Sequence, residues 1–342
     1  MIDGIYTLAN DVVYDQLVAL LNSIEANAGR QIPVCVIPYN ENIDKVKAEI
    51  ASRANVSLFD DSASLARWGE FGSRIYKSHT RSQQIIQQRG LKNKYRNERF
   101  RKFCCLDGLF DKFIFFDADT LLMKPVDYVY QKLDEYDWVT NDFQYQSDLN
   151  YVFNWTEEKI KEVFQIENFR NNIFCSGWFA SKKNIIDDAM LANLRDKLES
   201  GEVDVLHWVA SDQTLINYLV LRSGISYYNY ACHDQATGNH WSSKFDVVDN
   251  ILYDHGQALT YLHYMSISSS KFKTLCSGED VEIPYRDVFL HYRYLKSPEE
   301  RPKSFKRQSQ LVRLQKTTSS FLTQKVKNIQ LKYRNLKDRL VH

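Results

Sequence analysis

The sequence predicts an α/β protein in which helices flank a mostly parallel sheet. Among its 342 residues, 44% are hydrophobic and 13% aromatic, which is enough to build a large buried core. Short apolar runs typical of buried strands alternate along the chain with longer segments whose apolar residues recur at helical spacing. This alternation is typical of helices packed on the two faces of a parallel sheet.

The expected elements follow one another along the first 221 residues. The expected strands are 2–8, 33–38, 56–59, 112–116, 138–140 and 173–180. The expected helices are 14–27, 43–54, 184–198 and 212–221. Residues 67–101 are polar with helical spacing, and we expect them to form a lid or an insertion over the sheet. Specificity loops are expected at 67–96 and 144–172.

Charge is unevenly distributed along the chain. Residues 301–342 contain twelve Lys or Arg and one acidic residue, Asp338, which leaves 32 basic and 42 acidic residues in the remainder. The composition changes near Ser297, so we place a boundary there between a main domain, residues 1–296, and a C-terminal tail, residues 297–342. An uneven charge of this kind indicates that the tail has its own anionic partner.

Apolar residues recur between the basic ones through most of the tail. This pattern is typical of a basic amphipathic helix that lies on an anionic membrane surface, which is the partner that we expect for residues 300–342. RNA binding, a partner helix and a helix packed on the main domain are the alternatives, and nucleic acid is not the expected partner.

The predicted location is cytoplasmic, with the protein peripheral on the inner face of a membrane. The opening MIDGIYTLANDVVYD has neither the basic nor the apolar region of a secretion signal. No run reaches the about 18 apolar residues of a membrane span. The six cysteines lack CxxC spacing, which favours reduced thiols over zinc binding or a disulfide framework.

Two carboxylates end the most hydrophobic expected strand. In KFIFFDADTLLMKP, residues 112–125, Asp117 and Asp119 lie two positions apart, so an extended backbone turns both to one side. Ligands of open α/β sheets bind beyond the carboxyl ends of the strands. Two like charges so close repel each other, and a Mn²⁺ or Mg²⁺ ion bound to a substrate diphosphate would relieve this. The alternative is a turn in which the aspartates make only local hydrogen bonds.

Five segments in sequence order give this motif its context. They are IYTLANDVVYDQLVALLNSIEAN (5–27), RKFCCLDGLFDKFIFFDADTLL (101–122), FCSGWFASKKN (174–184), SDQTLINYLV (211–220) and YLHYMSISSSKFK (261–273). Together they resemble the GT-A fold glycosyltransferases, and in particular the family 8 retaining transferases that include glycogenin and bacterial lipooligosaccharide galactosyltransferases. The sequence departs from that family at Cys175, where the family has Asn, and in the last segment, which lacks the family's Gly, Pro and Trp.

The resemblance implies a GT-A fold and a metal-dependent hexosyltransferase. The enzyme would move a sugar from a nucleotide-diphosphate sugar, expected to be a UDP-sugar, to a glycan or lipid acceptor with retained configuration. Alternatives are an inverting transferase or a nucleotidyltransferase on the same fold. A further alternative is a non-catalytic, membrane-tethered protein that binds nucleotide sugars or glycans.

The resemblance also implies roles for individual residues. The expected metal ligands are Asp117, Asp119 and His263. The residues expected to bind the nucleotide-sugar donor are Thr7, Ala9, Asn10, Asp11, Lys102, Ala118, Ser176, Gly177 and Lys271. Within this set, Asp11 is the expected hydrogen-bond partner of the nucleoside, the two lysines would neutralise the diphosphate, and Gly177 would allow close backbone approach.

Asp212 and Gln213 are the expected catalytic residues. Asp212 would act as a carboxylate nucleophile, as in retaining glycosidases, or beside a front-side attack in which the acceptor approaches next to the leaving phosphate. Asn141 and Asp142 are expected on the acceptor side. The structural alternatives are a half-buried strand position for His263, solvated lysines, and helix caps at Asn10–Asp11 and Ser211–Asp212.

Overall fold

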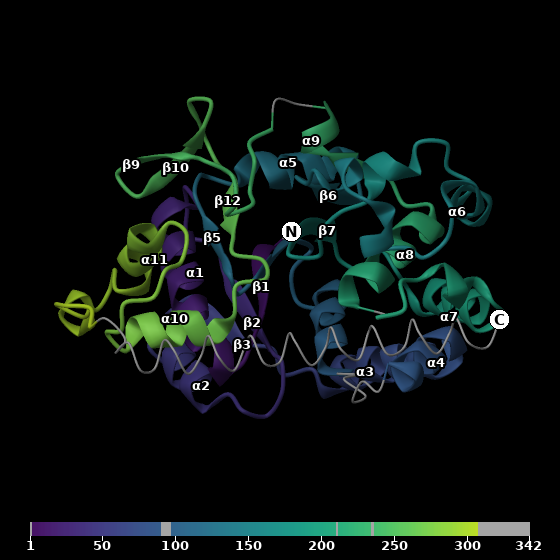
Figure 1. Cartoon of the computed structure of the whole chain (residues 1–342), viewed down its shortest axis with the longest axis horizontal. Helices are drawn as coiled ribbons and strands as arrows, with labels where there is room; N and C mark the ends of the chain where they lie inside the picture. Colours follow the sequence, from purple (N-terminus) through teal and green to yellow (C-terminus); the bar gives the residue numbers. More distant parts are fainter. Residues whose placement is uncertain (1, 90–96, 210, 234–235, 307–342) are drawn as a thin grey trace, which may run out of the picture.

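A seven-stranded sheet forms the centre of the molecule (Figure 1). The computed structural model describes residues 2–89, 97–209, 211–233 and 236–306. The strands in spatial order are β3 (Val56–Leu58), β2 (Val34–Pro38), β1 (Asp3–Ala9), β4 (Lys112–Asp117), β7 (Trp178–Lys182), β6 (Trp138–Thr140) and β8 (Tyr227–Asn229). All neighbours in this sheet are parallel except β7, which is antiparallel to both β4 and β6. The expected mostly parallel α/β fold is therefore confirmed.

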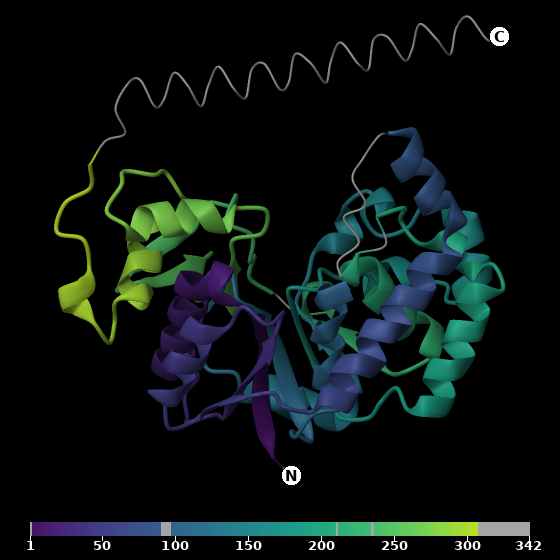
Figure 2. The same ribbon diagram turned by 90° about the horizontal axis from the view of Figure 1, so that it is seen from below.

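Helices cover both faces of this sheet, as Figure 2 shows. One face carries α1 (Tyr14–Asn27), α2 (Asp44–Ala51) and α5 (Asp127–Glu135). The other face carries α3 (Ser62–Ser78), α4 (Thr80–Gln88), α6 (Glu157–Phe164), α7 (Asp188–Glu199) and α8 (Asp212–Ser223). Each face thus has its own hydrophobic core.

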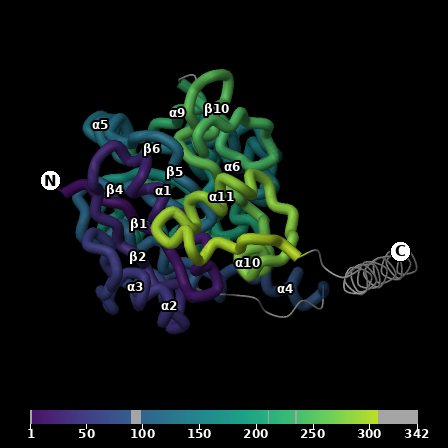
Figure 3. Tube along the Cα trace, turned by 90° about the vertical axis from the view of Figure 1, so that its left-hand side faces the viewer, coloured from purple at the N-terminus to yellow at the C-terminus, as the bar shows by residue number. Residues whose placement is uncertain are grey.

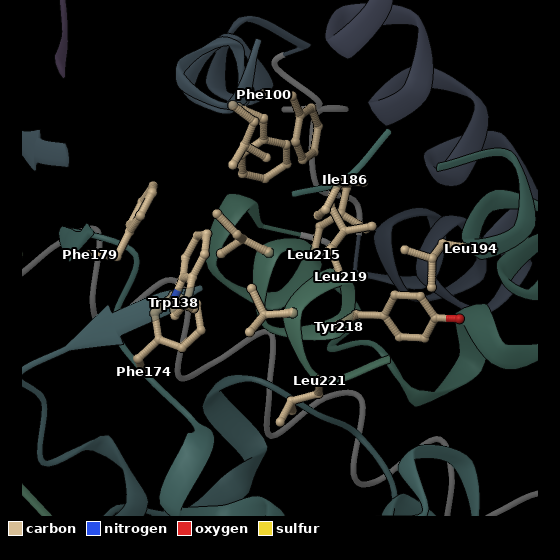
Figure 4. Close-up of a cluster of buried hydrophobic side chains, with 14 of the residues drawn as sticks. Phe100, Trp138, Phe174, Phe179, Ile186, Leu194, Leu215, Tyr218, Leu219 and Leu221 are labelled. Atoms are coloured by element: carbon tan, nitrogen blue, oxygen red, sulfur yellow. The ribbon is translucent and has the colours of Figure 1, made fainter. Parts of the chain in front are cut away.

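Strand β4 shows why both cores form from one continuous apolar run. Phe113 and Phe115 point into the core under α3 and α8, while Ile114 and Phe116 point into the core under α1. Successive side chains of a strand face opposite sides, so a strand covered on both faces must be apolar throughout. In Figure 4, Trp138 and Phe179 pack beside the leucines of α8, and their rings are stacked with centroids 4.5 Å apart.

Two smaller sheets complete the fold. β5 (Thr120–Leu122) pairs antiparallel with β12 (Tyr261–His263), which places residue 263 opposite Thr120. The second small sheet contains β9 (Asp246–Val248), β10 (Ile251–Asp254) and β11 (Gln257–Ala258). After β12, α10 (Ser269–Cys276) and α11 (Arg286–Arg293) pack against α1 around a third core, as Figure 3 shows for α11. The remaining short helix is α9 (Tyr230–His233), and the 3-10 segments are Asp11–Val13, Asn97–Leu106, Gln144–Gln146, Leu149–Tyr151, Phe169–Asn172, Glu202–Val205 and Pro298–Glu300.

The strand expected at 173–180 begins only at Trp178. The backbone of Phe174, within the expected strand, is paired with a side chain instead of a neighbouring strand. The N–H of Phe174 donates to Asn217 Oδ1 at 3.0 Å, and the Phe174 carbonyl accepts from Asn217 Nδ2 at 2.8 Å. Helix α7 likewise begins four residues later than expected, because Asp187 caps it by accepting from the Met190 N–H.

Residues 67–101 were expected to form a polar lid or an insertion over the sheet. The first helix of this segment does lie over one face of the sheet, but it belongs to the core and is not a polar lid. α3 begins at Ser62, capped by Asp61, and buries Trp68, Phe71 and Ile75 in the core. The three apolar residues recur at helical spacing, so one face of α3 packs inward while its polar residues face solvent.

The chain stays attached to the main domain beyond the expected boundary at 296. The Lys306 N–H donates to the Gly278 carbonyl, and the Asp280 N–H donates to the Lys306 carbonyl, both at 2.9 Å. The expected amphipathic helix of the tail lies outside the described residues, which end at 306. Within the described ranges, every helix is too short or too polar to cross a bilayer.

Candidate functional site

Three expected metal ligands meet at the carboxyl edge of the central sheet. Asp117 ends β4, Asp119 lies in the turn to β5, and His263 ends β12, which pairs with β5. One ligand atom from each residue lies within 4.8 Å of the others, and His263 Nε2 is 3.4 Å from Asp119 Oδ1. The turn is held by the Thr120 hydroxyl, which donates to the Asp117 carbonyl at 2.7 Å.

The chemistry of this donor set fits a divalent cation. Two carboxylates and one imidazole are ligands that Mn²⁺ accepts, and Mg²⁺ shares the preference for oxygen. Burial raises the pKa of Asp117, with Lys102 opposing the change. Burial also works against the charge on Asp119, but His263 and Lys102 together hold the pKa of that carboxyl below its usual range. A cation at this position would compensate the two buried carboxylates.

Gly177 makes room for the metal-site imidazole. A Cβ atom at this position would lie 2.3 Å from Cε1 of His263. The Gly177 carbonyl also accepts a hydrogen bond from the Asp117 N–H at 2.8 Å. The structure therefore gives Gly177 a role that the sequence did not indicate, which is to let His263 lie against the backbone beside Asp117.

Lys102 bridges two carboxylates in the interior. Its side chain is only 3% exposed, and its Nζ lies 2.9 Å from Asp117 Oδ1 and 2.8 Å from Asp212 Oδ2. It also donates to the Ser176 carbonyl at 3.1 Å. Burial opposes the charge, but the two carboxylates hold the pKa of Lys102 above its usual range. Lys102 is thus not a solvated lysine; it joins the end of β4 to the start of α8.

Asp212 faces the same site from the first turn of α8. Ser211 caps this helix by accepting from the Thr214 N–H at 3.3 Å, so the Asp212 carboxylate is not the cap. That carboxylate accepts from the Ser176 hydroxyl at 3.0 Å and pairs with Lys102. Burial would raise the pKa of Asp212, but Lys102, Arg99 and the Ser176 hydroxyl together hold the pKa below its usual range. The structure therefore presents an ionised, oriented carboxylate next to the metal ligands.

A pocket of about 660 Å³ lies on one side of the metal ligands. Asp117, Ala118 and Asp119 form part of its wall, together with Ala9 and Asn10 from the end of β1. Asn10 Oδ1 accepts from the Val12 N–H at 3.1 Å and so also caps a 3-10 turn. Further lining residues, which sequence reasoning missed, are Leu8, Val12, Val13, Gln16, Tyr39, Asn40, Glu98, Ile267 and Ser269.

Six residues expected to bind the donor are not part of this pocket wall, namely Thr7, Asp11, Lys102, Ser176, Gly177 and Lys271. Thr7 is fully buried within β1. The Asp11 carboxylate caps α2, because it accepts from the Lys45 N–H at 3.2 Å and the Val46 N–H at 3.1 Å. Lys271 is exposed in the first turn of α10.

A second pocket, of about 520 Å³, lies on the other side of the ligands. Its wall includes His263, Gln213, Asp142 and Cys175, and Cys175 Sγ lies 3.8 Å from Met265 Sδ. Burial raises the pKa of Asp142 to about 6. Asn141 is buried beneath this wall, and its Nδ2 donates to the Thr260 hydroxyl at 3.3 Å.

The missed residues differ in whether the sequence carried a signal for them. Tyr39 and Asn40 directly follow β2, and the Tyr39 N–H donates to the Ala9 carbonyl at 2.8 Å. The rule that ligands bind beyond strand carboxyl ends could therefore have found them. Asn239 and His240 reach the second pocket because their backbone runs beside His263, a pairing that no local pattern predicts.

Solved structures with a similar fold are glycosyltransferases. The apo structure of the bifunctional glycosyltransferase WbbM matches 87% of this chain at 13% identity with a TM-score of 0.51, and this chain spans 50% of WbbM. Mouse xyloside xylosyltransferase 1 matches 70% of the chain at 9% identity, covering 87% of that protein, with a TM-score of 0.44. Galactosyltransferase LgtC in complex with donor and acceptor sugar analogues matches 84% of the chain at 14% identity, covering all 100% of LgtC, with a TM-score of 0.45.

No protein-family model and no curated protein sequence matches the chain. The likeness to WbbM confirms the expected GT-A fold.

Proposed function

We propose that this protein is a metal-dependent glycosyltransferase that moves a sugar from a UDP-sugar to a glycan or lipid acceptor with retained configuration. The observation that carries the proposal is the position of the ligand cluster Asp117, Asp119 and His263 between two pockets at the carboxyl edge of the sheet. A donor nucleotide in one pocket and an acceptor in the other would meet at this cluster.

The residues around the first pocket are suited to hold the donor. Asp117, Asp119 and His263 would bind a Mn²⁺ or Mg²⁺ ion, which neutralises charge on a diphosphate leaving group. Asn10, Tyr39 and Asn40 offer polar groups for the nucleoside. Lys102 keeps the Asp117 carboxylate in place at 2.9 Å, so the chain orients its own ligand before any substrate arrives.

Asp212 and Gln213 are the residues that we place next to the transferred sugar. The Asp212 carboxylate is ionised and fixed by Lys102 and Ser176, which suits a nucleophile or a group that stabilises positive charge at the sugar carbon. Gln213 lines the acceptor-side pocket and can hydrogen-bond a sugar hydroxyl. The front-side route, in which the acceptor attacks beside the leaving phosphate, uses the same residues for orientation.

The test is metal-dependent release of UDP from a panel of UDP-hexoses. Candidate donors are first identified by thermal shift, because only ligands that bind the native state raise the melting temperature. We expect turnover with Mn²⁺ and none in excess chelator. Asp119→Ala should lower turnover by about 100-fold, which corresponds to about 2.7 kcal/mol. If Asp119→Ala releases UDP as fast as the parent protein, the proposed metal site is wrong. Proton NMR of the first-formed glycoside reports whether the anomeric configuration is retained.

We also propose that residues 307–342 attach the protein to an anionic membrane surface on the cytoplasmic side. The support is the charge and spacing of the sequence, with attraction of about 1 kcal/mol for each Lys or Arg near such a surface. Because the chain is tied to the main domain up to Lys306, a truncation after that residue removes the tail alone. Co-sedimentation with vesicles that contain phosphatidylglycerol should be lost in the truncated form and weakened by salt in the full chain. Equal sedimentation of both forms would contradict the anchor.

A further inference from the structure

Tyr151 is an exception among the aromatic side chains of this protein. Its side chain is 69% exposed, which makes it the most exposed of the Phe, Tyr and Trp residues whose exposure the structure describes. It lies on the wall of the second pocket, the pocket that also contains His263 and Gln213. Tyr rings are enriched at binding surfaces, because the ring is apolar while its hydroxyl can hydrogen-bond.

The backbone next to Tyr151 is hydrogen-bonded to α8, the helix that carries Asp212 and Gln213. Tyr151 ends the 3-10 turn Leu149–Tyr151, which Asp148 caps by accepting from the Asn150 N–H at 3.1 Å. The next two residues, Val152 and Phe153, are fully buried. The Val152 carbonyl accepts from the His207 N–H at 3.1 Å and from the Thr214 hydroxyl in α8.

The loop before Tyr151 is also held in place. The Arg170 guanidinium donates to the carbonyls of Tyr145 and Ser147 and pairs with Glu157. Tyr151 is therefore presented on a rigid support that is bonded to the helix carrying Asp212 and Gln213. A ligand that stacks on such a ring loses little binding energy to ordering the protein.

The polar groups of the second pocket indicate which ligand it takes. Among the described residues, its wall contains amides, hydroxyls, two imidazoles and the apolar side chains of Phe143 and Met265, and neither Lys nor Arg lines it. Among the described lining residues the one carboxylate is that of Asp142, whose Oδ1 accepts from the Gln144 N–H. The His263 imidazole already pairs with Asp119 at 3.4 Å, so the described residues of this wall offer no unpaired cation to a phosphate or a carboxylate. The mixture of hydrogen-bonding and apolar groups suits a sugar, whose ring has polar edges and apolar faces. It matches a neutral ligand rich in hydroxyl groups.

We propose that Tyr151 is a stacking platform for a second sugar ring, so that the acceptor is a neutral glycan of at least two units. This inference rests on the proposed function for the identity of the reacting end, which would lie near His263 and Gln213. The ring nearest the metal ligands would use the polar wall, and the next ring would lie against Tyr151. The pocket volume of about 520 Å³ is within the range of about 300–1,000 Å³ that is typical for ligands of this size.

The test measures binding of neutral disaccharides in the absence of any donor. Lactose, maltose and cellobiose, with galactose and glucose as their single-ring counterparts, are titrated into the full chain, and affinity is read from NMR saturation transfer. We expect at least one disaccharide to bind more tightly than its single ring. Tyr151→Ala should weaken that disaccharide by about tenfold and leave the single ring unaffected, because only one ring contact is lost. Tyr151→Phe should bind like the parent, because stacking does not need the hydroxyl.

A matched control and a separate readout keep the outcomes distinct. Leu109 is 67% exposed just before β4, at the opposite end of that strand from Asp117, so Leu109→Ala removes a similar exposed apolar group away from the pocket and should bind like the parent. The platform is overturned if none of the disaccharides binds more tightly than its single ring, or if Tyr151→Ala binds them like Leu109→Ala. Disaccharide binding is measured without donor, so it does not depend on transferase activity. If binding depends on Tyr151 but the protein turns over no UDP-sugar, the stacking proposal stands and the proposed transferase function is wrong.

Discussion

Gly177 shows how the absence of a side chain lets the candidate metal ligands come together. The imidazole of His263 occupies the space where any other residue would place its Cβ, 2.3 Å from Cε1. Gly177 also positions Asp117 through its carbonyl. One residue therefore aligns two of the three ligands, although it offers no ligand atom of its own.

Gly177→Ala should displace His263 and weaken Mn²⁺ binding by about 10- to 100-fold, the loss typical of residues that orient a ligand. Electron paramagnetic resonance of free Mn²⁺ measures this affinity directly. The matched control is Gly69→Ala in α3, where an added Cβ meets nothing within 4 Å. That control should keep the Mn²⁺ affinity and raise the free energy of unfolding by about 0.5–1 kcal/mol, because alanine favours a helix interior. Equal Mn²⁺ affinity in the two variants would show that Gly177 does not support the site.

Lys102 is a second single residue on which the site depends, because its one positive charge compensates two buried carboxylates. Lys102→Met leaves Asp117 and Asp212 without their cation, and we expect a loss of about 3–5 kcal/mol in the free energy of unfolding. Lys161→Met is the control, because Lys161 pairs with Glu157 at 3.9 Å and is 51% exposed. Removing such a surface pair should change stability by less than about 0.5 kcal/mol. Urea unfolding of both variants tests the difference, and similar losses would contradict the bridging role of Lys102.

At the scale of elements, the junction of α3 and α4 contains a buried histidine. His79 is fully buried, and its Nδ1 lies 3.9 Å from Asp204 Oδ1. Burial lowers the pKa of His79, and the opposing effect of Asp204 does not compensate. The folded protein therefore holds this ring neutral where the unfolded chain would protonate it.

Acidification should accordingly destabilise this junction. The stability that depends on neutral His79 is complete above the unfolded pKa of about 6.5 and is lost as the pH falls from there toward the lower folded pKa. The slope that one such group contributes is at most about 1.4 kcal/mol per pH unit. His79→Leu should flatten the decline in unfolding free energy between about pH 6.5 and pH 5, measured by urea titration at each pH. An unchanged decline would mean that other groups cause it.

At the scale of the whole molecule, the parallel strands of the central sheet could be predicted from the sequence. The strand pairings that bring the site residues together could not. The runs 33–38 and 113–116 are apolar throughout because β2 and β4 are covered on both faces, and that pattern is visible in the sequence. The antiparallel direction of β7 and the pairing of β5 with β12 depend on contacts between distant segments. Spacing within a segment carries no information about them.

The same distinction applies to the candidate site. Asp117 and Asp119 were evident from their place after a buried strand. The resemblance to known transferases identified His263 and Asp212, but the salt bridges of Lys102 to Asp117 and Asp212 and the space at Gly177 required the structure. Asp11 illustrates the opposite outcome. Its residue type and its loop suggested that it binds the donor, but its carboxylate caps α2.

The three candidate metal ligands come from distant parts of the sequence, and this leads to a prediction about global stability. Asp117 and Asp119 belong to the end of β4, whereas His263 ends β12 beside the third core. A cation bound by all three would bind only the folded protein, so Mn²⁺ at 100 times its dissociation constant should add about 2.7 kcal/mol to the free energy of unfolding. The melting temperature should then rise by several degrees, and Asp119→Ala should abolish the rise. Asp246→Ala removes an equal charge from the exposed strand β9 and should retain it. A melting temperature of the parent protein that does not respond to Mn²⁺ would show that the three residues do not form a metal site.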